Sequence, residues 1–181
     1  SATAVGSQTN ATGSGSSALG VNASASGVGS LVLGANATAK GLGAISTGLR
    51  ANSNATGGIA IGYLTDTDGS NATVIGTCSV ANGIDVIAVG NSAQATGVNA
   101  TAFGAGALAS GNDSMAKGAG ASATGANSSA FGAKATATHD GSSAVGAGAF
   151  TTRSNQFVLG TSNTEITSPS LAGEGTAIVA A

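Results

Sequence analysis

Apolar and polar positions along this chain recur with a period of 14 residues. A glycine that follows a small or apolar residue marks each repeat, and the spacing is held twelve times without an insertion. These glycines are Gly6, Gly20, Gly34, Gly48, Gly62, Gly76, Gly90, Gly104, Gly118, Gly132, Gly146 and Gly160. Two short segments lie between the turn residues of each repeat. The residue character alternates within each segment, which is typical of β-strands. The pattern predicts an all-β solenoid of 14-residue coils whose strands stack in parallel and in register, at about 4.8 Å per coil.

The turns of each coil are marked by two further columns, where a column is the set of residues at one place in every repeat. Seven residues after the periodic glycine stands a second glycine in most repeats, with Ala55, His139 and Arg153 as departures. The second column lies two residues further on, and each of its members, from Gly15 in the first repeat to Asn155 in the last, is Gly, Asn or Asp. These residue types tolerate a left-handed backbone, so this column predicts a tight turn in every coil.

Both faces of the first segment are apolar. The residue directly before the periodic glycine is large and apolar except at Thr47 and Lys117, and we expect it to face the core. The alanines three and five residues after the glycine are expected to meet it from the second segment. The other face of that second segment is polar, at the positions two, four and six after the glycine, and is expected to be solvated.

The column two residues before the glycine is a stripe of small apolar residues along the whole rod. We interpret it as the trimer-interface or core stripe, and the roles of the two apolar columns can be exchanged. In either case one apolar stripe faces outward. We expect another chain to cover this stripe, because an apolar stripe exposed to water promotes aggregation. The stripe comprises Ala18, Val32, Ala60, Val74, Ala88, Ala102, Ala116, Ala130, Ala144 and Val158.

Composition narrows the function to a structural or binding role. With a net charge of −2 and only five basic residues, the chain has no electrostatic footprint for nucleic acid or an anionic membrane. Cys78 and His139 are the only residues of their types, so we expect no intrachain disulfide, no metal site, no cofactor and no catalytic residue. A free thiol is favoured for Cys78 over a bridge between chains. No apolar run approaches the roughly 20 residues that span a bilayer.

Lys117 is the one charged residue in the large apolar column. An unpaired charge in a core would cost several kcal/mol. The ammonium group therefore either extends past the apolar surface into solvent, or the ammonium groups of three copies meet around an anion. Asp66 and Asp68 stand at alternate positions, as calcium ligands do, but no distal glutamate follows, which favours a solvated turn.

The repeat resembles the head repeat of YadA-like trimeric autotransporter adhesins. Copies such as Asn99-Ala-Thr-Ala-Phe-Gly-Ala-Gly-Ala-Leu-Ala-Ser-Gly111 and Asn127-Ser-Ser-Ala-Phe-Gly-Ala-Lys-Ala-Thr-Ala-Thr138 carry the resemblance. It implies a left-handed parallel β-roll of three intertwined copies, a homotrimer. Residues 1–160 would form twelve head coils, and residues 161–181, which include Pro169, a connector that leaves the roll.

The function implied by the resemblance is adhesion at a bacterial cell surface, outside the outer membrane and without direct membrane contact in this segment. Heads of this family bind host matrix proteins such as collagen, fibronectin and laminin, or join cells in autoaggregates and biofilms. Two alternatives remain, an ice-binding solenoid and a trimeric phage or viral fibre. Ice binding would need an outward threonine in nearly every coil, whereas the best column is interrupted by Lys40, Asn54, Asp68 and Asn82.

Overall fold

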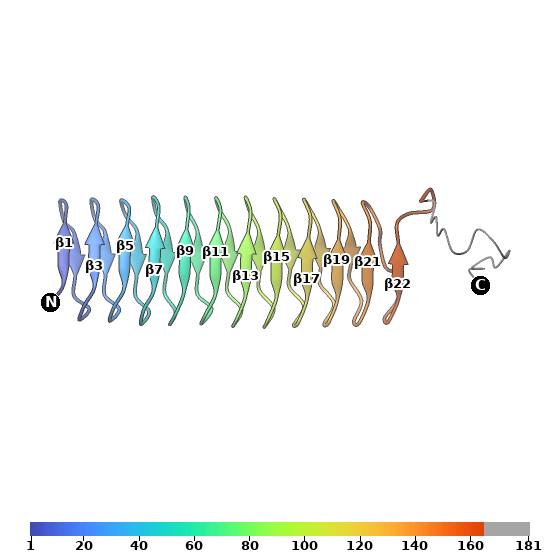
Figure 1. The fold of residues 1–181 in the computed structure, drawn as a ribbon, viewed down its shortest axis with the longest axis horizontal. Coiled ribbons are helices and arrows are strands. Elements are labelled where there is room, and N and C mark those ends of the chain that lie inside the picture. The colour runs from blue at the N-terminus through green and yellow to red at the C-terminus, as the bar shows by residue number, and fades with distance from the viewer. Residues whose placement is uncertain (165–181) are drawn as a thin grey trace, which may run out of the picture.

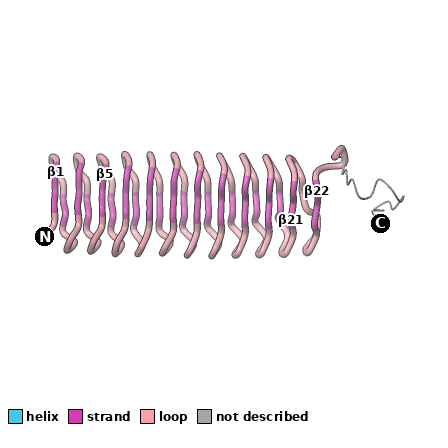
Figure 2. Tube along the Cα trace, in the orientation of Figure 1, coloured by secondary structure: helices cyan, strands magenta, loops and turns pink. Residues whose placement is uncertain are grey.

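The chain forms a parallel β-solenoid in which each 14-residue coil contributes one strand to each of two sheets. The structure is a computed structural model that describes residues 1–164. The coils stack in chain order from the N-terminus to β22 (Figure 1). Strand and turn segments alternate regularly along the trace (Figure 2). The described residues form no helix, and so they contain no helix that could cross a membrane.

The first sheet has twelve strands of three residues, one directly before each periodic glycine. They are β1 (Thr3–Val5), β3 (Ser17–Leu19), β5 (Leu31–Leu33), β7 (Ile45–Thr47), β9 (Ile59–Ile61), β11 (Thr73–Ile75), β13 (Ile87–Val89), β15 (Thr101–Phe103), β17 (Met115–Lys117), β19 (Ser129–Phe131), β21 (Ser143–Val145) and β22 (Phe157–Leu159).

The second sheet has ten strands of two residues, each four and five residues after a periodic glycine. They are β2 (Asn10–Ala11), β4 (Ser24–Ala25), β6 (Thr38–Ala39), β8 (Asn52–Ser53), β10 (Asp66–Thr67), β12 (Val80–Ala81), β14 (Gln94–Ala95), β16 (Leu108–Ala109), β18 (Ser122–Ala123) and β20 (Thr136–Ala137). A single parallel bridge from Thr136 to Phe150 extends this sheet by one coil. Within residues 1–164 the last coil therefore ends after its first-sheet strand.

Every strand pair is parallel and shifted by 14 residues, so each residue lies beside its equivalent in the next coil. Ala88, for example, pairs with Ala102, and Ala102 with Ala116. This register confirms the prediction from the sequence period. The division into head and connector at residue 160 stays a prediction, and most of the expected connector, including Pro169, lies outside the described residues.

The interior is filled by small side chains from both sheets. The column two residues before the glycine points inward from the first sheet, and the columns three and five residues after it point inward from the second, as at Ala102, Ala107 and Ala109. The largest fully buried side chains are Val32, Val74 and Val86. The two sheets therefore approach each other too closely for larger residues.

The expectation that the large apolar column faces the core is wrong. Leu19, Ile61 and Phe103 are 51%, 38% and 50% exposed on the outside of the first sheet. Large side chains do not fit between sheets spaced for alanine, so the alternation of the strand places them outward. The solenoid interior thus takes the small stripe, and the large column takes the outer face.

Left-handed residues form both turns of each coil. The Gly, Asn and Asp column from Gly15 to Asn155 has positive φ angles throughout, which confirms the predicted turn. A second column, two residues after the periodic glycine, also has positive φ, including Arg50, Leu64 and Cys78. The sequence interpretation had placed this column on the solvated face of a strand. The column is exposed, but its place on a strand is wrong. The turn was missed because Gly, Asn and Ser are mixed in this column with Gln, Arg, Leu, Cys and Lys.

Candidate functional surfaces

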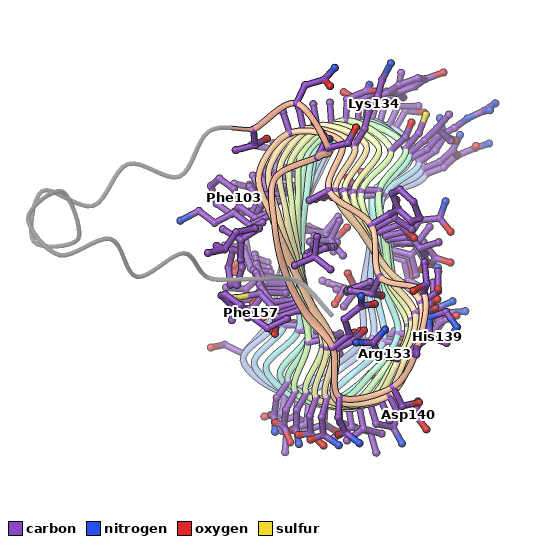
Figure 3. All side chains as sticks on the ribbon, turned by 90° about the vertical axis from the view of Figure 1, so that its right-hand side faces the viewer. Phe103, Lys134, His139, Asp140, Arg153 and Phe157 are labelled. Atoms are coloured by element: carbon purple, nitrogen blue, oxygen red, sulfur yellow. The ribbon has the colours of Figure 1, made fainter. Side chains whose placement is uncertain are left out.

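The outer surface of the first sheet, which we call the apolar face, consists of the residues one and three positions before each periodic glycine. Large apolar side chains with exposed fractions from 38% to 65% follow one another along it. They are Val5, Leu19, Leu33, Ile61, Ile75, Ile87, Phe103, Met115, Phe157 and Leu159. In the end-on view, Phe103 and Phe157 project from one side of the roll (Figure 3).

The turns that border this sheet widen the apolar face. Exposed large apolar residues occur in both turns, mainly in the N-terminal half of the rod. They are Val21, Leu49, Tyr63 and Leu64 in the turn that follows the periodic glycine, and Val28, Leu42, Ile84 and Val98 in the turn that precedes the first-sheet strand. Of the exposed large apolar residues of the described chain, only Phe150 lies on the second sheet instead. Outside the turns, the exposed large apolar residues of the described chain are thus concentrated on the first sheet.

The outer surface of the second sheet, which we call the polar face, consists of the residues four and six positions after each periodic glycine. Hydroxyl and amide side chains dominate it, as at Gln94, Thr96 and Ser110. Two asparagine–aspartate pairs link coils across it, from Asn52 Nδ2 to Asp66 Oδ1 at 2.8 Å and from Asn54 Nδ2 to Asp68 Oδ1 at 2.6 Å. The residues six positions after the glycine are mostly exposed, as expected, whereas those four positions after it are mostly half-buried.

The turn beside the first sheet carries a similar ladder. Asn71 Nδ2 donates to Asp85 Oδ1, and Asn99 Nδ2 donates to Asp113 Oδ1, each at 3.0 Å. Amide and carboxylate therefore alternate from Asn71 to Asp113, and no two carboxylates are neighbours in this column. The alternation keeps like charges two coils apart.

Lys117 is the last residue of β17 and lies exposed on the apolar face. Its register partners are Phe103 in the preceding coil and Phe131 in the following one. The sequence interpretation placed Lys117 in the core column, which is wrong. The ammonium group consequently needs no path out of the interior.

The residues considered for chemistry do not form a reactive site in the described chain. His139 Nδ1 lies 3.0 Å from Thr138 Oγ1, on the side of the roll opposite Phe103 (Figure 3). Asp66 and Asp68 are each occupied by an asparagine amide. No group of three or more His, Cys, Asp or Glu side chains suited to a metal ion occurs among residues 1–164. Cys78 is an exposed free thiol in a left-handed turn.

The predicted stripe of small residues is not a surface in the single chain. Ala18, Val32 and the equivalent members up to Ala144 are buried inside the solenoid, and Val158 is partly buried against the core. This stripe therefore offers no surface to another copy, and the exposed apolar surface of the first sheet is the apolar face. The bordering turn residues were missed from the sequence because turn positions do not follow the alternation of a strand.

Together these features define a small-residue parallel β-solenoid with one apolar and one polar outer face. The YadA head domain repeat matches at residues 1–23, 11–37, 25–51, 68–93, 95–121 and 123–149, which together span more than half of the chain. The chain therefore belongs to the YadA head repeat family.

A solved structure shares this architecture. The crystal structure of the collagen-binding domain of the Yersinia adhesin YadA is similar with a TM-score of 0.50 and 27% sequence identity. The similarity covers 71% of this chain and 72% of that one. No curated protein matches the chain significantly by sequence.

Proposed function

We propose that this chain is the head of a bacterial surface adhesin that acts as a homotrimer and binds a fibrous host protein of the collagen type. Membership of the YadA head repeat family and the likeness to a collagen-binding domain support the adhesin function. The observation that carries the proposal is the contrast between the apolar face and the polar face. The head would stand outside the outer membrane, where host matrix is accessible.

Burial of the apolar face supports the homotrimer. Solvent-exposed apolar stripes of this length are rare in soluble monomers, because they promote association. The repeat gives the face the same period in every copy, so parallel copies around one axis would match coil for coil. The first sheets would then face the axis and the second sheets would face outward.

The outward polar face is the surface proposed to bind the ligand. Its side chains are short and recur about every 4.8 Å along the rod. A long, flat and repetitive surface suits a fibrous partner, which also repeats along its length. Collagen comes first because of the YadA domain, and fibronectin, laminin and copies on other cells are further candidates.

The assembly is tested by the solution mass, measured by light scattering. We expect a mass near three chains for the wild type and a lower mass for Ile61→Glu, which places one carboxylate per chain in the apolar face. The matched control Ser110→Glu adds the same charge to the polar face and should leave the mass unchanged. A monomeric wild type would refute the assembly.

Ligand binding is tested separately, on immobilised triple-helical collagen. The double variant Thr96→Arg/Ser110→Arg adds two bulky cations to adjacent coils of the polar face, and we expect it to weaken binding by at least tenfold without a change of mass. A wild-type trimer that binds none of collagen, fibronectin, laminin and trimers on other cells would refute the adhesin function while leaving the assembly intact.

A further inference from the structure

Lys117 interrupts the apolar face at its most aromatic part. Phe103 and Phe131 are its register neighbours on either side, about 4.8 Å away along the sheet. Met115, on the same strand and the same face, is 39% exposed. In the single chain Lys117 is exposed to water.

Covering the apolar face changes the surroundings of this charge. The following inference rests on the proposed homotrimer. In parallel copies that match coil for coil, the three Lys117 residues lie at one height, and water is displaced from around them. Three positive charges in an apolar seam repel one another, and each costs several kcal/mol if unpaired. An uncharged residue at this place would avoid that cost, and every other coil has one.

We propose that the three Lys117 ammonium groups of the trimer bind one inorganic oxyanion, of the phosphate or sulfate class. A lysine ammonium carries three donors that can be turned toward a ligand, and it binds phosphate as a compact point charge. Three such groups around a symmetry axis match three of the four oxygens of a tetrahedral anion. The rings of Phe103 and Phe131 favour the cations at their faces and keep the site dry.

Among the described residues, no carboxylate lies on the apolar face with these cations. Asp66 and Asp68 lie on the opposite, polar face. Asp85 and Asp113 lie in the turn that borders the first sheet, and each accepts an asparagine amide. Asp113 is the nearest in sequence to Lys117, so a neighbouring copy's Asp113 is the alternative anion that the experiment must distinguish.

The test is thermal unfolding of the full chain during titration with sodium phosphate, at constant ionic strength set with sodium chloride. A bound ligand raises the unfolding temperature in a saturable way. We expect the wild type to gain roughly 2–3 °C at a hundredfold excess over the dissociation constant, because one anion stabilises three chains. The Lys117→Met variant, which keeps the length and apolar character of the side chain, should show no saturable gain.

Two further variants make the result specific. Lys117→Arg keeps the charge and should keep the saturable gain. Thr47→Val changes the other departure in the same column and should respond to phosphate as the wild type does. Asp113→Asn should also keep the gain. A saturable gain that is absent from the wild type and appears only in Asp113→Asn would assign the pairing of Lys117 to the neighbouring carboxylate and overturn the proposal.

The light-scattering mass separates this inference from the proposed function. A trimer whose unfolding temperature responds equally to phosphate in the wild type and in Lys117→Met refutes the anion site and leaves the assembly standing. A monomeric wild type refutes both. A trimer with a saturable response that disappears only in Lys117→Met supports the site.

Discussion

At the scale of single residues, the fold depends on backbone conformations and close approaches that only small residues allow. The periodic glycines have φ angles between 72° and 154°, a region in which residues with side chains are strained. A Cβ atom on Gly90 would lie 2.5 Å from the carbonyl oxygen of Gly104 in the next coil. Stacking therefore excludes a side chain at this position.

The Gly90→Ala variant should lower the free energy of unfolding by about 2–3 kcal/mol, because the backbone is strained and the adjacent coil must move. Gly106→Asn is the matched control in the neighbouring coil. Gly106 has a φ of 65° with open space around it, and Asn22 occupies the same column. Urea unfolding measures both, and equal effects of the two changes would contradict this account of the glycines.

Buried serines divide into two kinds. Ser46 Oγ donates to the Ala51 carbonyl oxygen at 2.7 Å, whereas the Oγ of Ser128 is buried without a partner. Ser128→Ala should raise the free energy of unfolding by about 1 kcal/mol, and Ser46→Ala should lower it by a similar amount. Ala100 already fills the column of Ser128. Chemical denaturation of the two variants decides the matter, and the same sign for both would refute the distinction.

At the scale of the elements, the strands are too short to be stable alone and are held by their equivalents in the adjacent coils. Each has only two or three residues. In-register stacking also brings identical columns together, so a charged residue meets whatever stands 14 residues away. The Asn71–Asp113 ladder, with its alternating amides and carboxylates, satisfies this constraint.

Asn99→Asp would place three carboxylates, at positions 85, 99 and 113, on consecutive coils. We expect it to lower the free energy of unfolding by about 1 kcal/mol at low salt, because like charges repel and the amide donor to Asp113 is lost. Sodium chloride should restore part of the loss by screening. Asp113→Asn, which removes a charge from the same ladder, should be nearly neutral. A loss that salt leaves unchanged would point to a cause other than repulsion.

At the scale of the whole molecule, the solenoid is close to one-dimensional, since each coil contacts the coils directly before and after it. Its properties should therefore scale with the number of coils. Its two outer faces extend along the stack of coils. A change in coil number would shorten or lengthen these faces without altering their character.

Deleting residues 91–104 removes one full repeat and joins Gly90 to Ala105 in register. We expect a folded protein with the same β-type circular dichroism spectrum and a somewhat lower urea midpoint. Deleting residues 91–97 removes half a repeat, which brings first-sheet segments against second-sheet segments and should abolish cooperative unfolding. Comparable stability of the two deletion variants would contradict the requirement for coil register.

Much of this architecture could be predicted from the sequence. The period predicted the parallel register, and the Gly, Asn and Asp column predicted one of the two turns. The other turn escaped prediction, because its Gly, Asn and Ser residues are interrupted by residues such as Arg50, Leu64 and Cys78. Lys117 could be singled out as a departure in its column, but its surroundings could not be assigned correctly while that column was placed in the core.

The sequence by itself determined the repeat, the register and the presence of two apolar surfaces on the first-sheet strands, because a fixed period and strict alternation leave no freedom in these features. It did not determine which apolar surface is inside, since alternation is the same for both. Only the tertiary structure decided this. The close approach of the two sheets admits alanine, serine and an occasional valine, so the large residues are left outside, where a second copy is proposed to cover them.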